Sequence, residues 1–240
     1  GDLLVHHALR VLGEIKDAEA NLQGLLGGET GQLSVGLVST AKYFMPRLLA
    51  QFSQAHPGIE VQFSVGNRES LLQKLQDNAI DLAVMGRIPV EIDAHAEPMA
   101  SHPYVLIGPS DHPLRDARRF DLHELRHETF LLREEGSGSR RVAEEMFKNH
   151  LFTPARTISM GSNETIKQAV MAGMGIALIS LHTLPLELKT AEVSILDVIG
   201  TPIERTWYVV HMNSKRLLPA GQRFRQFLLE QAAPGLEREF

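Results

Sequence analysis

Short apolar runs alternate with amphipathic stretches along the first half of the chain, and the two patterns predict different elements. Apolar runs at 32–38, 59–65 and 80–85 predict strands. The stretches at 43–55 and 70–78 carry apolar residues at the helical period and predict helices. Because parallel strands joined by helices form a doubly wound sheet, this βαβαβ order predicts an α/β fold.

The same order recurs in the second half of the chain. Strands are predicted at 104–108, 129–132, 156–160, 176–180 and 205–212, and helices at 121–127, 141–150, 165–172 and 220–231. The last strand and helix are expected to return to the first lobe. We therefore assign 31–100 and 208–232 to one Rossmann-like lobe and 101–207 to the other. Two lobes joined by two crossings predict a hinged clamp with a ligand cleft between them.

An apolar seam precedes the first lobe. Its members follow one another at spacings of 4, 3, 4, 3, 4 and 3 residues and are Leu4, Ala8, Val11, Ile15, Ala18, Leu22 and Leu25. So strict a heptad period favours a coiled coil, and we interpret 1–28 as a linker helix that forms a dimer. The alternative is an amphipathic helix packed on its own domain.

Composition narrows the function classes. The net charge of the 240 residues is −5, so the chain as given is not an obvious nucleic-acid binder. Cysteine is absent, which excludes disulfide scaffolds and Cys-ligated metals. No apolar run has the length of a membrane span, and no signal peptide is recognisable. Because the chain opens with Gly inside a helical pattern, we expect it to be part of a longer protein.

Three turns place small polar residues where a predicted helix starts, and a polar turn also precedes the helix at 70–78. Simple N-capping explains each turn alone, but helix N-termini at the carboxyl edge of a parallel sheet favour anions. Four cations lie in or beside these turns, and each could instead be solvated or paired with Glu69, Glu134 or Glu135. Taken together, the turns predict a phosphorylated or carboxylated ligand. The candidate ligand-binding residues are Ser39, Thr40, Ala41, Lys42, Asn67, Arg68, Arg87, Glu135, Gly136, Ser137, Gly138, Ser139, Arg140, Ser162, Asn163 and Thr165.

Two motifs suggest enzymes but have simpler explanations. His123-Glu124-Leu125-Arg126-His127 fits the zinc-peptidase pattern H-E-x-x-H. In a short α-helix whose apolar face is Leu122 and Leu125, both His would face solvent, with Asp121 as N-cap. Gly173-Met174-Gly175 lies between a helix and a strand, the reverse of the dinucleotide-binding order. We therefore expect no catalytic residues, no metal and no cofactor.

Several stretches resemble a known family, the LysR-type transcriptional regulators. The matching stretches are 31–36, 52–58 with His56-Pro57-Gly58, 81–84 and 172–179. The resemblance implies an effector-binding domain with the type II periplasmic binding-protein fold, after the linker helix. The stretches 39–47 and 133–140 are similar to regulators of Calvin-cycle (RuBisCO) operons. In that group the effector would be an anionic metabolite such as ribulose bisphosphate, phosphoenolpyruvate, NADPH or ATP.

The resemblance also implies partners. A winged helix-turn-helix preceding Gly1 would bind DNA, the regulatory domains would pair as homodimers, and the full-length protein would form tetramers. The regulator would act in the cytoplasm, as an activator of carbon-fixation genes, with RNA polymerase as a further possible partner and no membrane association. The shared fold leaves one alternative open, a solute-binding protein of a transporter; a zinc metallopeptidase is a more remote one.

Overall fold

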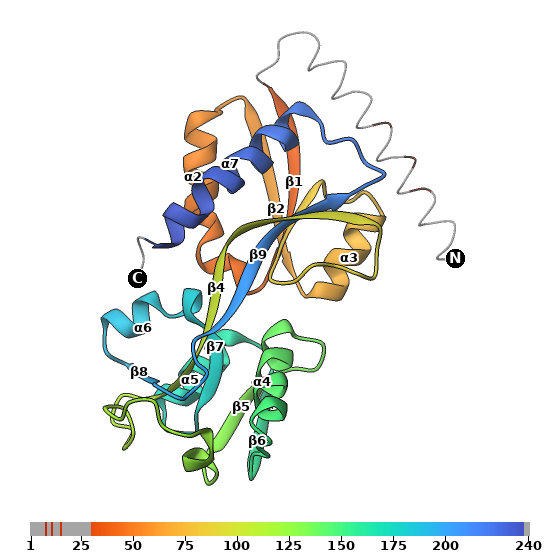
Figure 1. The fold of residues 1–240 in the computed structure, drawn as a ribbon. Coiled ribbons are helices and arrows are strands. Elements are labelled where there is room, and N and C mark those ends of the chain that lie inside the picture. Colours follow the sequence, from red (N-terminus) through yellow and green to blue (C-terminus); the bar gives the residue numbers. More distant parts are fainter. Residues whose placement is uncertain (1–7, 9–10, 12–14, 16–29, 238–240) are drawn as a thin grey trace. The chain divides into compact units, whose positions relative to one another are not determined.

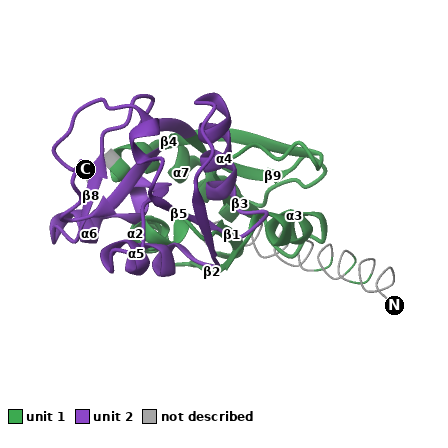
Figure 2. Cartoon of the chain, turned by 90° about the horizontal axis from the view of Figure 1, so that it is seen from below, with its two compact units in different colours: residues 1–101, 206–240 green, residues 102–205 purple. Residues whose placement is uncertain are grey.

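The computed structural model describes residues 8, 11, 15 and 30–237 (Figure 1). The chain divides into two compact units (Figure 2). Unit 1 comprises 1–101 and 206–240, and unit 2 comprises 102–205. The alternation of strands and helices in both units confirms the α/β prediction. Two long strands, β4 (Ala94–Pro109) and β9 (Ile203–Met212), contain the points at which the chain passes from one unit to the other.

Unit 1 is built on a mixed sheet with the strand order β2-β1-β3-β9-β4. Strands β1 (Gly31–Val38), β2 (Ile59–Gly66) and β3 (Leu82–Met85) are parallel, as predicted, with β1 in the middle. Strand β9 runs antiparallel to β3. Within 30–101 and 206–237, the helices of unit 1 are a 3-10 helix at Ala41–Tyr43, α2 (Met45–Ala55), α3 (Arg68–Gln76) and α7 (Pro219–Glu237).

Helices cover both faces of the unit 1 sheet because side chains alternate along each strand. On one face, Leu33, Val35 and Leu37 of β1 pack in a core with residues of α2 and α7. On the other face, Ala83 and Met85 of β3 pack against α3. Figure 1 shows α2 and α7 together, with α3 on the opposite side of β1. This three-layer arrangement leaves the carboxyl ends of β1, β2 and β3 at one edge of the sheet.

Unit 2 repeats this arrangement around a different set of strands. Strands β5 (Thr129–Arg133) and β6 (Arg156–Met160) form a parallel pair, and β4 pairs antiparallel with β7 (Ala177–Ser180) and β8 (Val193–Leu196). A bridge between Phe130 and Ile176 connects β5 to the start of β7. The helices are α4 (Gly138–Asn149), α5 (Asn163–Met171), α6 (Pro185–Lys189) and 3-10 helices at Leu122–Leu125 and Leu181–Thr183.

The core of unit 2 also has two faces. Helix α4 packs with Phe130 and Leu132 of β5, whereas α5 packs with Leu131 of the same strand. Gly175 fixes how closely β7 approaches β5. Its φ is +159°, and a Cβ there would lie 2.2 Å from the carbonyl oxygen of Thr129. Only glycine fits this position, because any side chain would overlap the backbone of β5.

The structure differs from the sequence prediction in several elements. Strand β4 begins at Ala94, ten residues before the predicted strand, and includes Pro98 and Pro103. Strand β8 and helix α6 were not predicted. Of the apolar seam, Ala8, Val11 and Ile15 are helical and exposed. Leu4, Ala18, Leu22 and Leu25 lie outside the described residues, so the dimerising linker stays a prediction. None of the described helices is long and apolar enough to cross a membrane.

Candidate functional site

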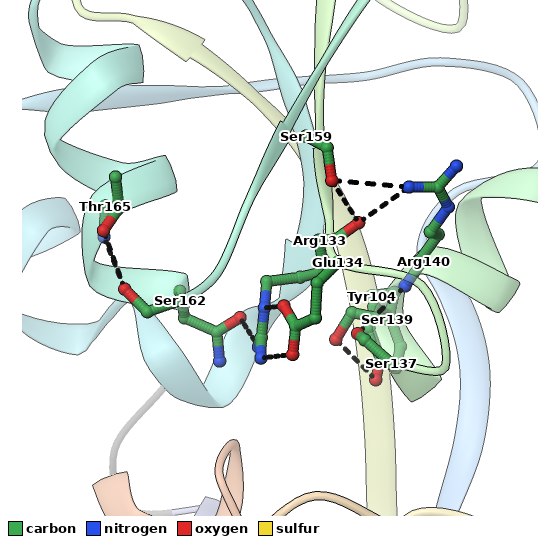
Figure 3. Close-up of polar contacts among 10 residues, drawn as sticks. Tyr104, Arg133, Glu134, Ser137, Ser139, Arg140, Ser159, Ser162 and Thr165 are labelled. Atoms are coloured by element: carbon green, nitrogen blue, oxygen red, sulfur yellow. Dashed lines mark hydrogen bonds and ion pairs between the residues drawn. The ribbon is translucent and has the colours of Figure 1, made fainter.

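Two helix N-termini meet at the carboxyl edge of the β5–β6 pair in unit 2. Because β5 and β6 are parallel neighbours, the turns that follow them emerge at the same edge. Ser137 caps α4 by accepting a hydrogen bond from the N–H of Arg140 at 3.4 Å. Ser162 caps α5 by accepting one from the N–H of Thr165 at 3.0 Å. The structure thus confirms the predicted capping and places both helix starts beside one another (Figure 3).

Arg133, at the end of β5, joins the two turns. Its Nη1 donates to the Asn163 side-chain oxygen at 2.7 Å, and its guanidinium donates to both carboxylate oxygens of Glu134 at 2.6 Å (Figure 3). The Arg133 side chain is 7% exposed and that of Glu134 39%. Burial raises the pKa of the Glu134 carboxyl, but the hydrogen bonds and positive charge of Arg133, together with a backbone hydrogen bond, lower it further, and the pKa lies below its ordinary value. The site therefore contains a buried cation whose counter-ion reaches solvent.

The start of α4 contributes further polar groups. The Ser139 hydroxyl lies 3.4 Å from the hydroxyl of Tyr104, and both residues are buried. Burial raises the pKa of Tyr104, so its phenol stays protonated and available as a hydrogen-bond donor at neutral pH. Arg140 forms an ion pair with Glu144 at 2.8 Å and a longer one with Glu135 at 4.0 Å. It also donates to the carbonyl oxygen of Arg133 at 3.2 Å.

The turn between β5 and α4 contains the remaining candidates of unit 2, Gly136 and Gly138. Gly136 has a φ of +80°, a backbone conformation that favours glycine and that turns the chain into the helix. Gly138 is the first residue of α4. A Cβ at either position would meet no atom within 4 Å. These glycines therefore shape the turn and leave open space around the start of α4.

In unit 1, a second group of candidates gathers at the carboxyl edge of the sheet. Asn67 caps α3 by accepting from the N–H of Ser70 at 2.8 Å. Arg68 donates to the carbonyl oxygens of Arg87 and Ile88 at 3.1 Å each, so the turns after β2 and β3 are joined. Arg68 also pairs with Glu91 at 2.7 Å, rather than with Glu69 as considered from the sequence. Arg87 itself is exposed.

The turn after β1 corrects one sequence expectation. Ser39-Thr40-Ala41 was predicted to start an α-helix with a polar cap, but a 3-10 helix begins at Ala41 and α2 only at Met45. The N-cap of the 3-10 helix is Thr40, with no side-chain capping hydrogen bond, and Phe44 precedes α2. Thr40 and Ala41 are buried, and the Lys42 ammonium lies 5.1 Å from the centre of the Tyr43 ring.

The H-E-x-x-H segment does not form the α-helix assumed for it. Leu122–Leu125 is a 3-10 helix, so an angle of about 100° per residue does not apply and His127 lies beyond its end. Asp121 caps it as predicted, accepting from the N–H of His123 at 2.8 Å. The His123 ring packs on Phe152 and lies 3.2 Å from the carbonyl oxygen of His150. Both His are exposed, and neither is part of the metal-ligand group found among the described residues.

Sequence reasoning missed the buried charges of unit 2. Tyr104 had been assigned to a strand and Arg133 to the turn after one, and neither was counted among the site residues. Lys167 on α5 is also buried, and pairs with Glu187 at 2.6 Å and Glu164 at 3.2 Å. The Arg133–Glu134 dipeptide at the end of an apolar strand was a usable signal, because a charge there needs a partner. The groups of this site offer hydrogen bonds and charge to a small anion.

The sequence also matches a known protein family. The model of the LysR substrate binding domain covers residues 26–233. The chain belongs to the LysR family. The family and its fold therefore agree with the resemblance carried by the motifs, and the structural neighbours are LysR effector-binding domains with the type II periplasmic binding-protein fold.

LysR-family relatives align along most of this chain. The HTH-type transcriptional regulator CfxR of Cupriavidus necator is 63% identical over 240 residues, which are 100% of this chain and 76% of CfxR. A RuBisCO operon transcriptional regulator of Allochromatium vinosum is 44% identical, over 95% of this chain and 76% of that protein. The regulatory domain of Synechocystis CcmR, solved in complex with 2-PG, has a TM-score of 0.79 and 40% identity over 83% of this chain and 96% of that one.

These LysR-family relatives decide between the function classes left open by the sequence. CfxR and the Allochromatium protein are transcriptional regulators, so the chain is an effector-sensing domain of a regulator and not an enzyme. The same relatives argue against a transporter's solute-binding protein and against a zinc peptidase.

Proposed function

We propose that this chain binds a small phosphorylated or carboxylated metabolite at the carboxyl edge of the unit 2 sheet and thereby controls carbon-fixation genes. The observation that supports it most is Arg133, a buried guanidinium placed between the N-termini of α4 and α5. Helix N-termini favour anions, and a guanidinium matches carboxylate and phosphate oxygens with paired hydrogen bonds. The similarity of this chain to a RuBisCO operon transcriptional regulator supports the control of carbon-fixation genes.

The candidate effectors share a dense negative charge. We propose ribulose bisphosphate, phosphoenolpyruvate, NADPH and ATP, together with 2-PG because the CcmR regulatory domain was solved with it. The hydroxyls of Ser137, Ser139 and Ser162 would donate to the anion, and Arg140 would add a nearby positive charge. In unit 1, the turns after β1 and β3 hold a separate set of candidates, Ser39, Lys42 and Arg87.

The regulator would work as an oligomer in the cytoplasm. LysR regulators bind DNA and act as oligomers. We propose a homodimer formed through the 1–28 helix and a tetramer in the full-length protein. Its DNA-binding helix-turn-helix would precede this chain, with RNA polymerase as a possible further partner. Effector binding would shift the equilibrium between two states of that assembly, which requires the effector to bind one state more tightly.

Calorimetric titration tests the proposal. Each candidate effector is titrated into the chain, with inorganic phosphate and sulfate as controls for simple anion binding. We expect at least one metabolite to bind more tightly than either control. Ser137→Ala and Ser162→Ala should each weaken that binding about tenfold, because a hydrogen bond to a charged group contributes about 1.5 kcal/mol or more.

Ser194→Ala is the matched control variant. Ser194 is a half-buried serine on β8 whose hydroxyl donates to the carbonyl oxygen of Ser110, outside both helix starts. The Ser194→Ala variant should bind the metabolite with the same affinity as the original chain. If no metabolite bound more tightly than phosphate, the proposed function would be wrong. If a metabolite bound but Ser137→Ala and Ser162→Ala left its affinity unchanged, only the position of the site would be wrong.

A further inference from the structure

A second cluster of polar side chains lies in unit 1, on the neighbouring strands β4 and β9. His95 and Glu97 are two residues apart on β4, so their side chains point to the same face of the sheet. His211 lies on β9, beside β4 in the strand order. A backbone hydrogen bond from Asn213 to Asp93 at 3.1 Å fixes the pairing of the two strands next to it. Three potential metal ligands are therefore placed on one surface.

The distances between these groups approach those of a coordination shell. One ligand atom from each of His95, Glu97 and His211 lies within 4.8 Å of the other two. The His95 Nε2 lies 3.6 Å from a carboxylate oxygen of Glu97. Ligand atoms about 2.0–2.1 Å from a tetrahedral zinc ion lie about 3.4 Å from one another. His95 and Glu97 are already near this separation, and the ligand atom of His211 lies within 4.8 Å of both.

The hydrogen bonding of the His211 ring also suits a metal ligand. Its Nδ1 lies 3.1 Å from the carbonyl oxygen of Met212, where it can donate a hydrogen bond. That hydrogen bond would leave the lone pair on Nε2, and metal-binding histidines commonly have such an outer partner.

Glu97 has an outer partner of its own. Arg225 of α7 donates to one of its carboxylate oxygens at 2.8 Å and contacts the other. The hydrogen bond from Arg225 is the main reason that the pKa of Glu97 lies below its ordinary value. An ionised carboxylate has about four lone-pair sites, of which Arg225 takes two, so Glu97 retains acceptor capacity for a metal. Arg225 thereby orients the Glu97 carboxylate. Its positive charge also lowers the expected affinity of the site for a metal cation.

We propose that His95, Glu97 and His211 form a binding site for a divalent transition-metal ion such as Zn²⁺. Two imidazoles and a carboxylate suit Zn²⁺ and its neighbours in the first transition row, whereas Mg²⁺ and Ca²⁺ prefer oxygen ligands. A fourth position would be open to water because His95 is exposed. Strands β4 and β9 both continue into unit 2, so the ion would link the two chain connections at their unit 1 ends.

Zinc titration of the EDTA-treated chain, by calorimetry and by competition with a chromophoric chelator, tests this site. We expect one Zn²⁺ per chain and no saturable binding of Mg²⁺. His95→Ala and His211→Ala should each weaken zinc binding about 100-fold or more, because loss of an outer partner alone costs about 10–100-fold. Visible absorption of Co²⁺ bound in place of zinc should report a histidine-containing site and disappear in both variants.

The H-E-x-x-H segment provides the matched control. The double variant His123→Ala/His127→Ala also removes two exposed histidines but should bind zinc like the original chain. His95→Gln is a milder second variant at the exposed position, and circular dichroism without metal checks that each variant is folded. The proposal is overturned if zinc does not saturate a site on the original chain. It is also overturned if the His123/His127 variant loses binding, or if the folded His95 and His211 variants keep it.

Discussion

The buried ion pair between Lys167 and Glu187 should contribute strongly to the stability of unit 2. It holds α5, the helix whose N-terminus is part of the candidate site. Lys167 lies on α5, five residues after the Ser162 cap, and Glu187 lies on α6. The Lys167 side chain is 4% exposed and that of Glu187 11%, and the two charged atoms are 2.6 Å apart. Lys167 also donates to the carbonyl oxygen of Thr183 at 3.1 Å. Lys167→Met would keep the apolar stem but leave Glu187 buried without this countercharge.

The magnitude follows from the cost of an uncompensated buried charge. Breaking a buried ion pair from one side costs about 3–5 kcal/mol, and the partial exposure of Glu187 favours the lower value. We therefore expect Lys167→Met to lower the free energy of unfolding by about 3 kcal/mol. In urea unfolding followed by circular dichroism, this corresponds to a midpoint about 1–1.5 M lower.

A double variant distinguishes two contributions to the loss of stability: the absence of the ion pair, and the burial of the Glu187 charge without a partner. Lys167→Met/Glu187→Leu removes both charges and should recover most of the lost stability, because well-packed apolar residues replace buried pairs at little cost. Lys189→Met, an exposed lysine on the same α6, should change stability by less than about 0.5 kcal/mol. A loss below about 1 kcal/mol for Lys167→Met, or a double variant less stable than the single one, would refute this reasoning.

Two further predictions concern other parts of unit 2. Gly175→Ala should cost about 2 kcal/mol or more, because its Cβ would overlap the Thr129 carbonyl at a φ that only glycine adopts easily; a thermal melt should shift down by about 4–8 °C, and an unchanged melt would contradict this. Burial lowers the pKa of His182 to about 4, whereas in the unfolded chain the ring gains a proton below about pH 6.5. This contribution to stability is therefore complete above about pH 6.5 and is lost as the pH falls towards 4, by about 3 kcal/mol in all. Urea midpoints measured between these pH values should fall less steeply for His182→Gln, and an identical slope would refute the assignment.

The sequence predicted best where local chemistry decides the structure. Ser137 and Ser162 were recognised as caps because a serine before an amphipathic stretch satisfies the free N–H groups of a helix start. The turn after β1 contains the same residue types, but there Thr40 is buried and the α-helix begins later, at Met45. Packing against the sheet outweighed capping propensity at that turn, and no local pattern shows this.

Features that depend on contacts between residues far apart in the chain were harder to predict from the sequence. Strand β4 was only partly predicted because Pro98 and Pro103 interrupt its pattern, although proline is tolerated in a strand wherever its missing N–H is not needed for pairing. The antiparallel position of β9 next to β3 depends on a return of the chain from the second unit. His95 and His211 are brought together by that return, so their proximity has no signature in the sequence.

Arg133 and Glu134 together explain how the unit 2 site could discriminate among anions. In this structure the Glu134 carboxylate accepts from Nε and Nη2 of the Arg133 guanidinium, so the ion pair carries no net charge. An incoming anion must compete with a carboxylate that is already in place, which costs affinity for every anion alike. A single weak charge gains too little to displace Glu134, whereas a phosphorylated metabolite brings more charge and can also engage the N–H groups of α4 and α5. At the proposed site the pair would therefore favour multiply charged effectors over simple monovalent anions, because the Glu134 side chain is 39% exposed and can rotate into solvent when such an effector binds.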